Sequence, residues 1–152
     1  MEAAFVMYGQ QEGNNAEIQK VLDYFGTKLS QDQYAWCAPF LSYVHAQAGV
    51  PLRIQSARAF LKQGKIVPVS QAQVGDVLVL RNTNDATGGW KGWGGHAVLI
   101  VKQEGDVFWG LGGNQAGEVN VTMFHRDRVL GVRRIEAKAT PTLLAQSDQK
   151  FA

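Results

Sequence analysis

The chain has 152 residues, of which 45% are hydrophobic and 18% are charged, and its formal net charge is +2. This composition is typical of one globular domain with a buried core, and it excludes a disordered chain. Its apolar runs are far shorter than the roughly 18 residues of a membrane-spanning helix, and no cluster of basic residues indicates a nucleic-acid partner. The single cysteine, Cys37, excludes an internal disulfide framework and a thiolate-rich metal site. We therefore expect no metal and no cofactor.

The first half of the chain has the apolar spacing of helices. Asn14 and Glu17 predict the start of a helix whose apolar residues recur every three or four positions. A second helix is expected to begin at 36–39, because Pro39 is tolerated only in a first helical turn. Cys37 therefore lies at or just before the N-terminus of that helix. A third, short helix is predicted at 56–63.

The second half of the chain changes to the pattern of strands. Five β-branched or aromatic runs, separated by Gly, Asn and Asp, occupy 76–81, 96–102, 106–111, 118–123 and 129–135. Two of these runs do not alternate, which predicts central strands that are covered on both faces. Short connections favour antiparallel hairpins, so the arrangement is α+β. We expect a single domain over 1–136, interrupted by a glycine-rich loop at 82–95, and a loosely attached tail at 137–152.

Cys37 is the candidate nucleophile. A helix N-terminus lowers the pKa of a thiol, and its unpaired N–H groups can stabilise an oxyanion. An inert, buried thiol is the alternative interpretation. Among the histidines, His45 lies about 12 Å further along the same helix and cannot reach the sulfur, and His125 lies in a polar stretch typical of a solvated turn. His96 opens an apolar strand directly after the glycine-rich loop, where packing alone would favour a valine or isoleucine. It is the candidate base.

A third residue is expected to orient the imidazole by a hydrogen bond. Asn114 follows two glycines at the end of the next strand, where a sharp turn can bring an amide beside the ring, as in Cys-His-Asn arrangements. An ordinary Gly-Gly-Asn turn without a catalytic role is the alternative.

Four short segments together resemble the NlpC/P60 and CHAP group of papain-like cysteine peptidases and amidases. They are Trp36-Cys37-Ala38-Pro39-Phe40, Gly75-Asp76-Val77, Gly95-His96-Ala97-Val98 and Leu111-Gly112-Gly113-Asn114-Gln115. The pattern is most similar to a small single-domain bacterial and phage branch with Trp-Cys-Ala-x-Phe and Gly-Gly-Asn-Gln motifs. It covers residues from about Gly13 to Arg134. Pro39 departs from the second alanine of the family motif, which a first helical turn tolerates.

The resemblance implies a papain-like fold with N-terminal helices packed on a five- to six-stranded antiparallel sheet. It also implies a peptidoglycan hydrolase that cuts an amide bond of the cell-wall peptide through a thioester acyl-enzyme. Cys37 matches the nucleophile, His96 the base and Asn114 the place of the third residue, for which Gln115 is a rival. Tyr34 is a candidate oxyanion donor, and Trp36, Trp90 and Trp93 are candidates for the walls of the substrate groove. For these aromatic side chains, ordinary core packing is the alternative.

The expected partner is peptidoglycan, and the protein is expected to be a monomer. The N-terminal segment is a poor secretory signal, which predicts synthesis in the cytoplasm and action at the cell wall or periplasm after delivery by lysis or a secretion system. A phage lysin or an antibacterial effector fits this pattern, and an effector would have an inhibitor (immunity) protein. A non-catalytic wall-binding module on the same fold is the alternative function.

Overall fold

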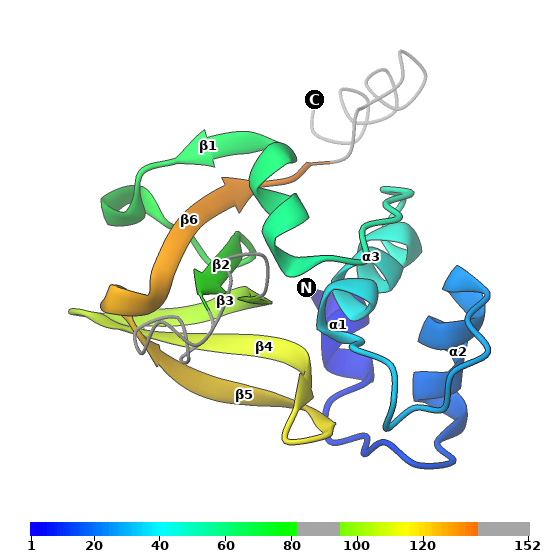
Figure 1. The fold of residues 1–152 in the computed structure, drawn as a ribbon. Helices are drawn as coiled ribbons and strands as arrows, with labels where there is room; N and C mark the ends of the chain where they lie inside the picture. The colour runs from blue at the N-terminus through cyan, green and yellow to red at the C-terminus, as the bar shows by residue number, and fades with distance from the viewer. Residues whose placement is uncertain (82–94, 137–152) are drawn as a thin grey trace, which may run out of the picture.

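The computed structural model describes residues 1–81 and 95–136, which form a layer of helices on a curved antiparallel sheet (Figure 1). In chain order, the elements are α1 (Glu2–Val6), α2 (Ala16–Phe25), α3 (Cys37–Gln47), the 3-10 helix η1 (Ala57–Lys62), β1 (Lys65–Val67), the 3-10 helix η2 (Val69–Gln71), β2 (Val77–Arg81), β3 (Gly95–Glu104), β4 (Val107–Gln115), β5 (Glu118–His125), the 3-10 helix η4 (Arg126–Arg128) and β6 (Val129–Arg134). The expected tail at 137–152 lies outside the described residues.

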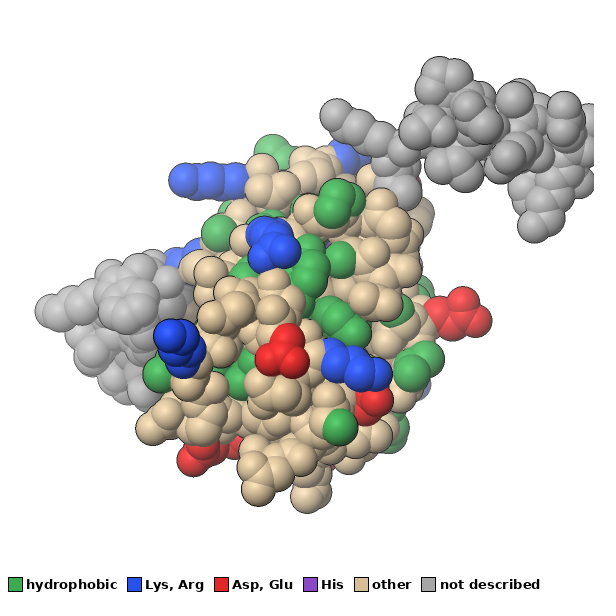
Figure 2. Space-filling model, turned by 90° about the vertical axis from the view of Figure 1, so that its right-hand side faces the viewer, with side chains coloured by type: hydrophobic (Ala, Val, Ile, Leu, Met, Phe, Trp, Pro, Cys, Tyr) green, Lys and Arg blue, Asp and Glu red, His purple; other side chains and the backbone are tan. Residues whose placement is uncertain are grey.

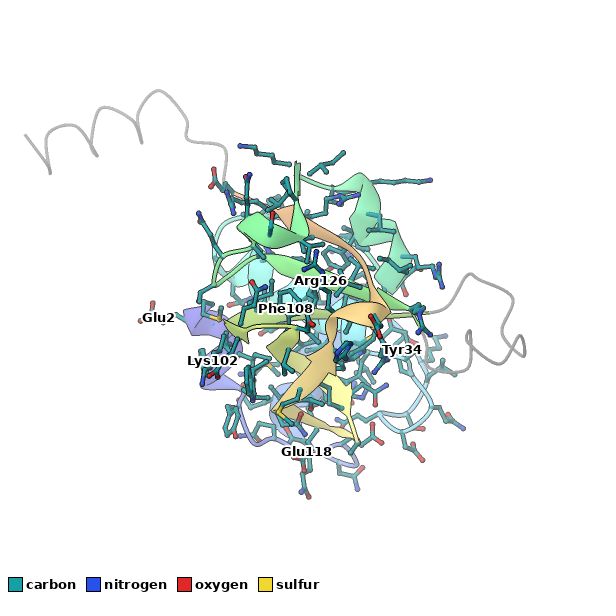
Figure 3. All side chains as sticks on the ribbon, turned by 90° about the vertical axis from the view of Figure 1, so that its left-hand side faces the viewer. Glu2, Tyr34, Lys102, Phe108, Glu118 and Arg126 are labelled. Atoms are coloured by element: carbon teal, nitrogen blue, oxygen red, sulfur yellow. The ribbon has the colours of Figure 1, made fainter. Side chains whose placement is uncertain are left out.

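The six strands form one sheet in the order β1-β6-β2-β3-β4-β5, with every neighbouring pair antiparallel. Side chains on one face, such as Val79 and Leu99, pack with α1, α2 and α3 in the larger hydrophobic core. Side chains on the other face form a second core around Phe108, on the side that Figure 3 shows. Burial of β2 on both faces confirms the interpretation of its non-alternating apolar run.

Helix α3 is the central element of the helical layer. Little of its surface is exposed, because α1, α2 and the strands β3 and β4 all contact it. On β4, Gly113 lies directly under the helix, where an added Cβ would come within 2.7 Å of Phe40 and 2.8 Å of Trp36. A glycine at this position therefore allows β4 to approach the first turn of α3.

Several local predictions need correction. Asn15, not Asn14, caps α2, since its side chain accepts hydrogen bonds from the backbone N–H groups of Glu17 and Ile18. The expected third helix is a 3-10 helix, and Ser56 makes no side-chain cap there. Helix α1 and strand β1 are too short for a periodic pattern and were not predicted. The α+β arrangement on a six-stranded antiparallel sheet is confirmed.

The outer face of the helical layer carries single acidic and basic side chains rather than a continuous patch of one charge (Figure 2). Within residues 1–81 and 95–136, no helix has the length and apolar character that crossing a bilayer requires.

Candidate active site

Cys37 is the first residue of α3 and is partly buried. The backbone N–H groups of Ala38, Ala97 and Cys37 lie near enough to its thiol to favour the thiolate. Those of Cys37 and Ala38 belong to the free N–H groups that every helix N-terminus leaves without an intrahelical partner. Ala97 belongs to β3 and directly follows His96 in the chain. The thiol of α3 therefore lies against the same end of β3 that carries His96.

His96 is the second residue of β3, and its imidazole lies beside β4 and β5. Its Nε2 lies 2.9 Å from Oε1 of Gln115, a side chain with only 7% of its surface exposed. The ring of Phe124 flanks the imidazole, with 5.7 Å between the ring centroids. These contacts hold the imidazole in one orientation.

The hydrogen bonds of Gln115 determine which nitrogen of His96 carries the proton. The Gln115 amide nitrogen donates to the backbone oxygen and to Oδ1 of Asn120, both at 2.7 Å. Because a backbone oxygen can only accept, the Gln115 oxygen must face His96, and Nε2 of His96 must be the donor. In the neutral imidazole, Nδ1 is then left as the proton acceptor.

Asn120 holds Gln115 from the adjacent strand. Its Nδ2 donates to the backbone oxygen of Gln115 and to Glu118, both at 3.0 Å, and its Oδ1 also accepts from the Thr122 hydroxyl at 2.8 Å. Each polar atom of the Asn120 side chain is thus satisfied. A satisfied network of this kind fixes its members in a single arrangement.

The structure places Gln115, and not Asn114, against His96. Gly112 and Gln115 pair with Asn120 and Glu118 of β5, so β4 contains one more residue than β5 between these two pairs. This is a β-bulge, and Asn114 within it has a left-handed backbone with φ of 55°. Strict alternation from Gly112 would have put Asn114 on the face of His96, and the extra residue gives that place to Gln115.

Both candidate groups are shifted toward their uncharged forms. Burial raises the pKa of the Cys37 thiol, although the three N–H groups oppose this effect. Burial also lowers the pKa of His96, where the bond to Gln115 acts in the opposite direction and the charge of Arg128 adds to the lowering. The expectation that the helix N-terminus makes the thiol anionic is therefore corrected: desolvation outweighs the helix N-terminus. Both shifts favour a neutral thiol and a neutral imidazole in the free protein.

The candidate aromatic residues have different surroundings. Trp36 is completely buried, and its indole N–H donates to Glu12 at 2.8 Å, so it belongs to the core and not to an open groove. The Tyr34 hydroxyl donates its proton to Gln55 at 2.7 Å, so that proton is not available to an oxyanion in this arrangement. Trp90 and Trp93 lie outside the described residues.

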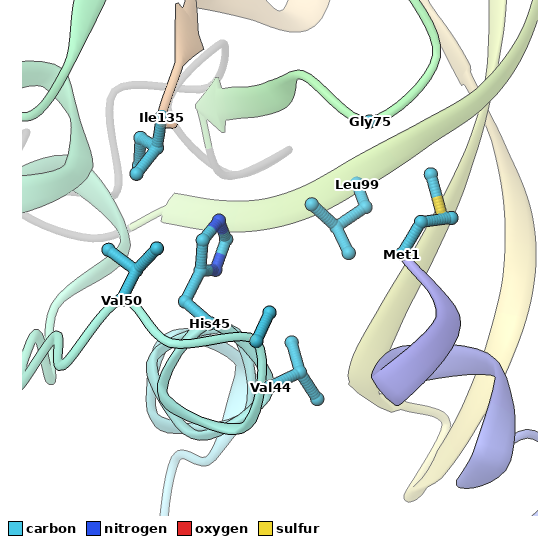
Figure 4. Close-up of a pocket in the computed structure, with 8 residues that line it drawn as sticks. Met1, Val44, His45, Val50, Gly75, Leu99 and Ile135 are labelled. Atoms are coloured by element: carbon cyan, nitrogen blue, oxygen red, sulfur yellow. The ribbon is translucent and has the colours of Figure 1, made fainter. Parts of the chain in front are cut away.

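The other two histidines are not part of this site. His45 lies near the opposite end of α3 and lines a separate cavity of about 160 Å³, where its Nδ1 donates to the backbone oxygen of Leu41 at 2.7 Å (Figure 4). Burial lowers the pKa of His45. His125 is exposed, and its Nδ1 accepts the backbone N–H of Asp127 at 3.2 Å.

A second cavity adjoins the candidate site. It has a volume of about 310 Å³ and is lined by His96, Asn114, Gln115, Ala116, Asn120, Thr122 and Phe124. Sequence analysis identified neither Asn120 nor Phe124, because only strand pairing brings them to His96. Within residues 1–81 and 95–136, no group of three His, Cys, Asp or Glu side chains is arranged to hold a metal ion.

No family model and no curated protein matches the sequence. Solved structures are similar to it to different degrees. The peptidoglycan hydrolase RipB from Mycobacterium tuberculosis is 19% identical, with a TM-score of 0.55 over 88% of this chain and 61% of RipB. A lipoprotein-like protein of the NLP/P60 family from Staphylococcus aureus is 18% identical, with a TM-score of 0.47 over 86% of this chain and 45% of that protein.

The P60 domain of an antigen from Mycobacterium avium subspecies paratuberculosis is 16% identical, with a TM-score of 0.47 over 80% of this chain and 95% of that domain. This chain thus spans less than two thirds of the first two proteins. At these identities the likeness concerns the fold, and RipB has the highest TM-score of the three. The chain has the α+β fold of RipB, with helices packed on a six-stranded antiparallel sheet.

Proposed function

We propose that this protein is a cysteine hydrolase of the NlpC/P60 superfamily that cuts an amide bond in peptidoglycan. The observation that supports this most directly is the meeting of three elements at one end of β3. Helix α3 brings the Cys37 thiol against the amide of Ala97, and His96 next to it is oriented by Gln115. The substrate class is taken from the fold shared with RipB, described as a peptidoglycan hydrolase.

In the proposed reaction, Nδ1 of His96 takes the thiol proton as the Cys37 sulfur attacks the amide carbonyl carbon. The N–H groups of Cys37 and Ala38 stabilise the negative charge that develops on the carbonyl oxygen. The protonated His96 then gives its proton to the leaving amine as the carbon–nitrogen bond breaks, which leaves a thioester. Neutral His96 next activates a water molecule, which hydrolyses the thioester and releases the thiol.

The uncharged resting pair fits this order of events. A buried thiol with a raised pKa is a weak nucleophile until a base removes its proton in the transition state. The lowered pKa of His96 favours its unprotonated form, which can act as that base. The Gln115 oxygen accepts from Nε2 throughout, so it stabilises the imidazolium that forms during attack.

The direct test uses purified sacculi and two variants at the nucleophile. Cys37→Ala should abolish the release of soluble muropeptides and leave the thermal midpoint of unfolding close to that of the wild type. Cys37→Ser keeps the size of the side chain and should also be inactive or nearly so. Release of muropeptides by Cys37→Ala at the wild-type rate would refute the assignment. Wall binding by wild-type protein without any cleavage would favour the non-catalytic wall-binding module.

Mass spectrometry of the released fragments identifies the bond that is cut. The use of this activity by a phage lysin or an antibacterial effector, with an inhibitor protein in the second case, stays a prediction. Growth arrest after expression directed to the periplasm, compared with expression in the cytoplasm, tests whether the wall is the target.

A further inference from the structure

We infer that the cavity between His96 and Phe124 binds the leaving half of the substrate, and that Arg128 selects leaving fragments that carry a free carboxylate. This inference rests on the proposed amide hydrolysis and adds the chemistry of the fragment that departs. It concerns residues of β5 and η4 that neither the motifs nor the mechanism above includes.

The position of the cavity identifies which half of the substrate it receives. His96 must protonate the leaving nitrogen, so the fragment attached to that nitrogen lies on the imidazole side of the scissile bond. The cavity is lined by His96 together with Asn120, Thr122 and Phe124 of β5. Cys37 is not among its lining residues, so the cavity holds substrate groups beyond the reacting atoms.

Arg128 is not a lining residue of this cavity, but it places a cation on Phe124, which is one. Its guanidinium carbon lies 5.3 Å from the centroid of the Phe124 ring, which also flanks His96. The charge of Arg128 contributes to lowering the pKa of His96, so the two groups are within electrostatic reach of each other. A negative group bound beside Arg128 would therefore lie close to the imidazole.

The Arg128 cation has no negative partner among the residues that the structure describes. Its Nε and Nη2 donate to the backbone oxygen of Arg81, at 3.3 and 3.2 Å, which fixes the plane of the guanidinium. No carboxylate lies within ion-pair distance in the described ranges, and Nη1 has no hydrogen-bond partner there. Partial burial and the neighbouring Arg81 both lower the pKa of Arg128. A partly buried, preoriented cation without a counter-charge favours an anionic ligand.

The side chains along the cavity complement this cation. Asn120 and Thr122 are uncharged, so no fixed negative charge on the cavity wall would repel a carboxylate. The Phe124 ring gives an apolar floor for the carbon chain between the leaving nitrogen and its acidic group. The site thus fits an amino acid or short peptide amine with a free carboxylate and discriminates against the corresponding carboxamide.

The kinetic test compares two soluble stem peptides that span the bond identified on sacculi and differ only in a carboxylate or a carboxamide on the leaving fragment. Wild-type kcat/KM should be about 10- to 100-fold higher for the carboxylate, as expected for charge-assisted hydrogen bonds. Arg128→Gln should reduce this ratio to near one. Arg126→Gln, which changes an exposed arginine of the same turn, should keep the wild-type ratio (Figure 3).

A binding test does not depend on catalysis. In the 15N-labelled Cys37→Ala protein, meso-diaminopimelate should shift the amide signals of residues 120–124 and the Arg128 Nε–H signal, and its diamide should shift them far less. Arg128→Gln should abolish the difference. Equal shifts with both compounds, no shifts with either, or a carboxylate-to-carboxamide ratio near one in the wild type would overturn the inference. Loss of hydrolysis with intact carboxylate binding would instead count against the proposed function.

Discussion

The hydrogen bond from His96 to Gln115 can be tested by replacing the acceptor. Gln115→Ala removes the oxygen that accepts from Nε2 of His96. It also removes the amide that donates to the backbone oxygen and to Oδ1 of Asn120, although Oδ1 keeps its bond from the Thr122 hydroxyl. A hydrogen bond to a charged group contributes about 1.5–3 kcal/mol, and this bond is strongest when His96 is protonated in the transition state. We therefore expect kcat/KM to fall by about 10- to 100-fold.

The pH profile of kcat/KM shows in which direction each substitution shifts the pKa of His96. The bond to Gln115 raises the pKa of His96, because it stabilises the imidazolium. Without it the pKa falls further, so the acid limb of kcat/KM should move to lower pH in Gln115→Ala. In Gln115→Glu, a carboxylate replaces the amide, and the acid limb should move to higher pH. The assay is initial-rate hydrolysis of a soluble muropeptide across the pH range.

Asn114 gives the matched control. Its left-handed backbone suits glycine, so Asn114→Gly avoids new strain, and it removes an amide that makes no bond to His96. Its acid limb should coincide with that of the wild type. The reasoning fails if Gln115→Ala keeps the wild-type acid limb and rate, or if Asn114→Gly shifts the limb.

Three further predictions concern the thiol and the packing around it. Iodoacetamide should alkylate Cys37 slowly at neutral pH and faster as the pH rises above the ordinary thiol pKa, because burial raises the pKa of this group; a rate that levels off well below pH 8.5 would contradict this. Gly113→Ala should destabilise the fold by about 1–3 kcal/mol in urea unfolding, because the added Cβ overlaps the first turn of α3. The control Met123→Ala, at an exposed site, should change the free energy of unfolding by less than about 0.5 kcal/mol. Ser42→Ala should cost about 1–3 kcal/mol by the same measurement, since the buried hydroxyl bonds both the N–H and the oxygen of Ile54 at 2.8 Å; a midpoint equal to that of the wild type would contradict this.

Sequence analysis predicted the elements that have a strong local signal. Pro39 fixed the start of α3, and the structure has Cys37 as its first residue. The glycine-rich loop followed by an apolar run predicted the strand that carries His96. Antiparallel pairing followed from the short connections, and the strand order was left open because pairing between distant segments has no local signal.

The sequence was less informative where tertiary contacts decide the outcome. Counting residues along β4 favours Asn114, and only the bulge brings Gln115 to His96. The helix N-terminus suggested a lowered pKa for Cys37, but the desolvation that reverses this effect comes from packing of α3 against the sheet. Asn120 and Phe124 reach the site through β5, whose pairing with β4 sequence spacing could not place.

The bulge at the end of β4 also has an evolutionary consequence. Its two amide residues are under different constraints. Asn114 has a left-handed backbone, which only glycine, asparagine and aspartate adopt readily. Gln115 must instead supply a hydrogen-bond acceptor on a side chain long enough to reach His96. Among descendants of this chain, Asn114 should exchange freely with glycine, and Gln115 should exchange only together with Asn120. Treating Gly112-Gly113-Asn114-Gln115 as a single unit would hide the different requirements at its last two positions.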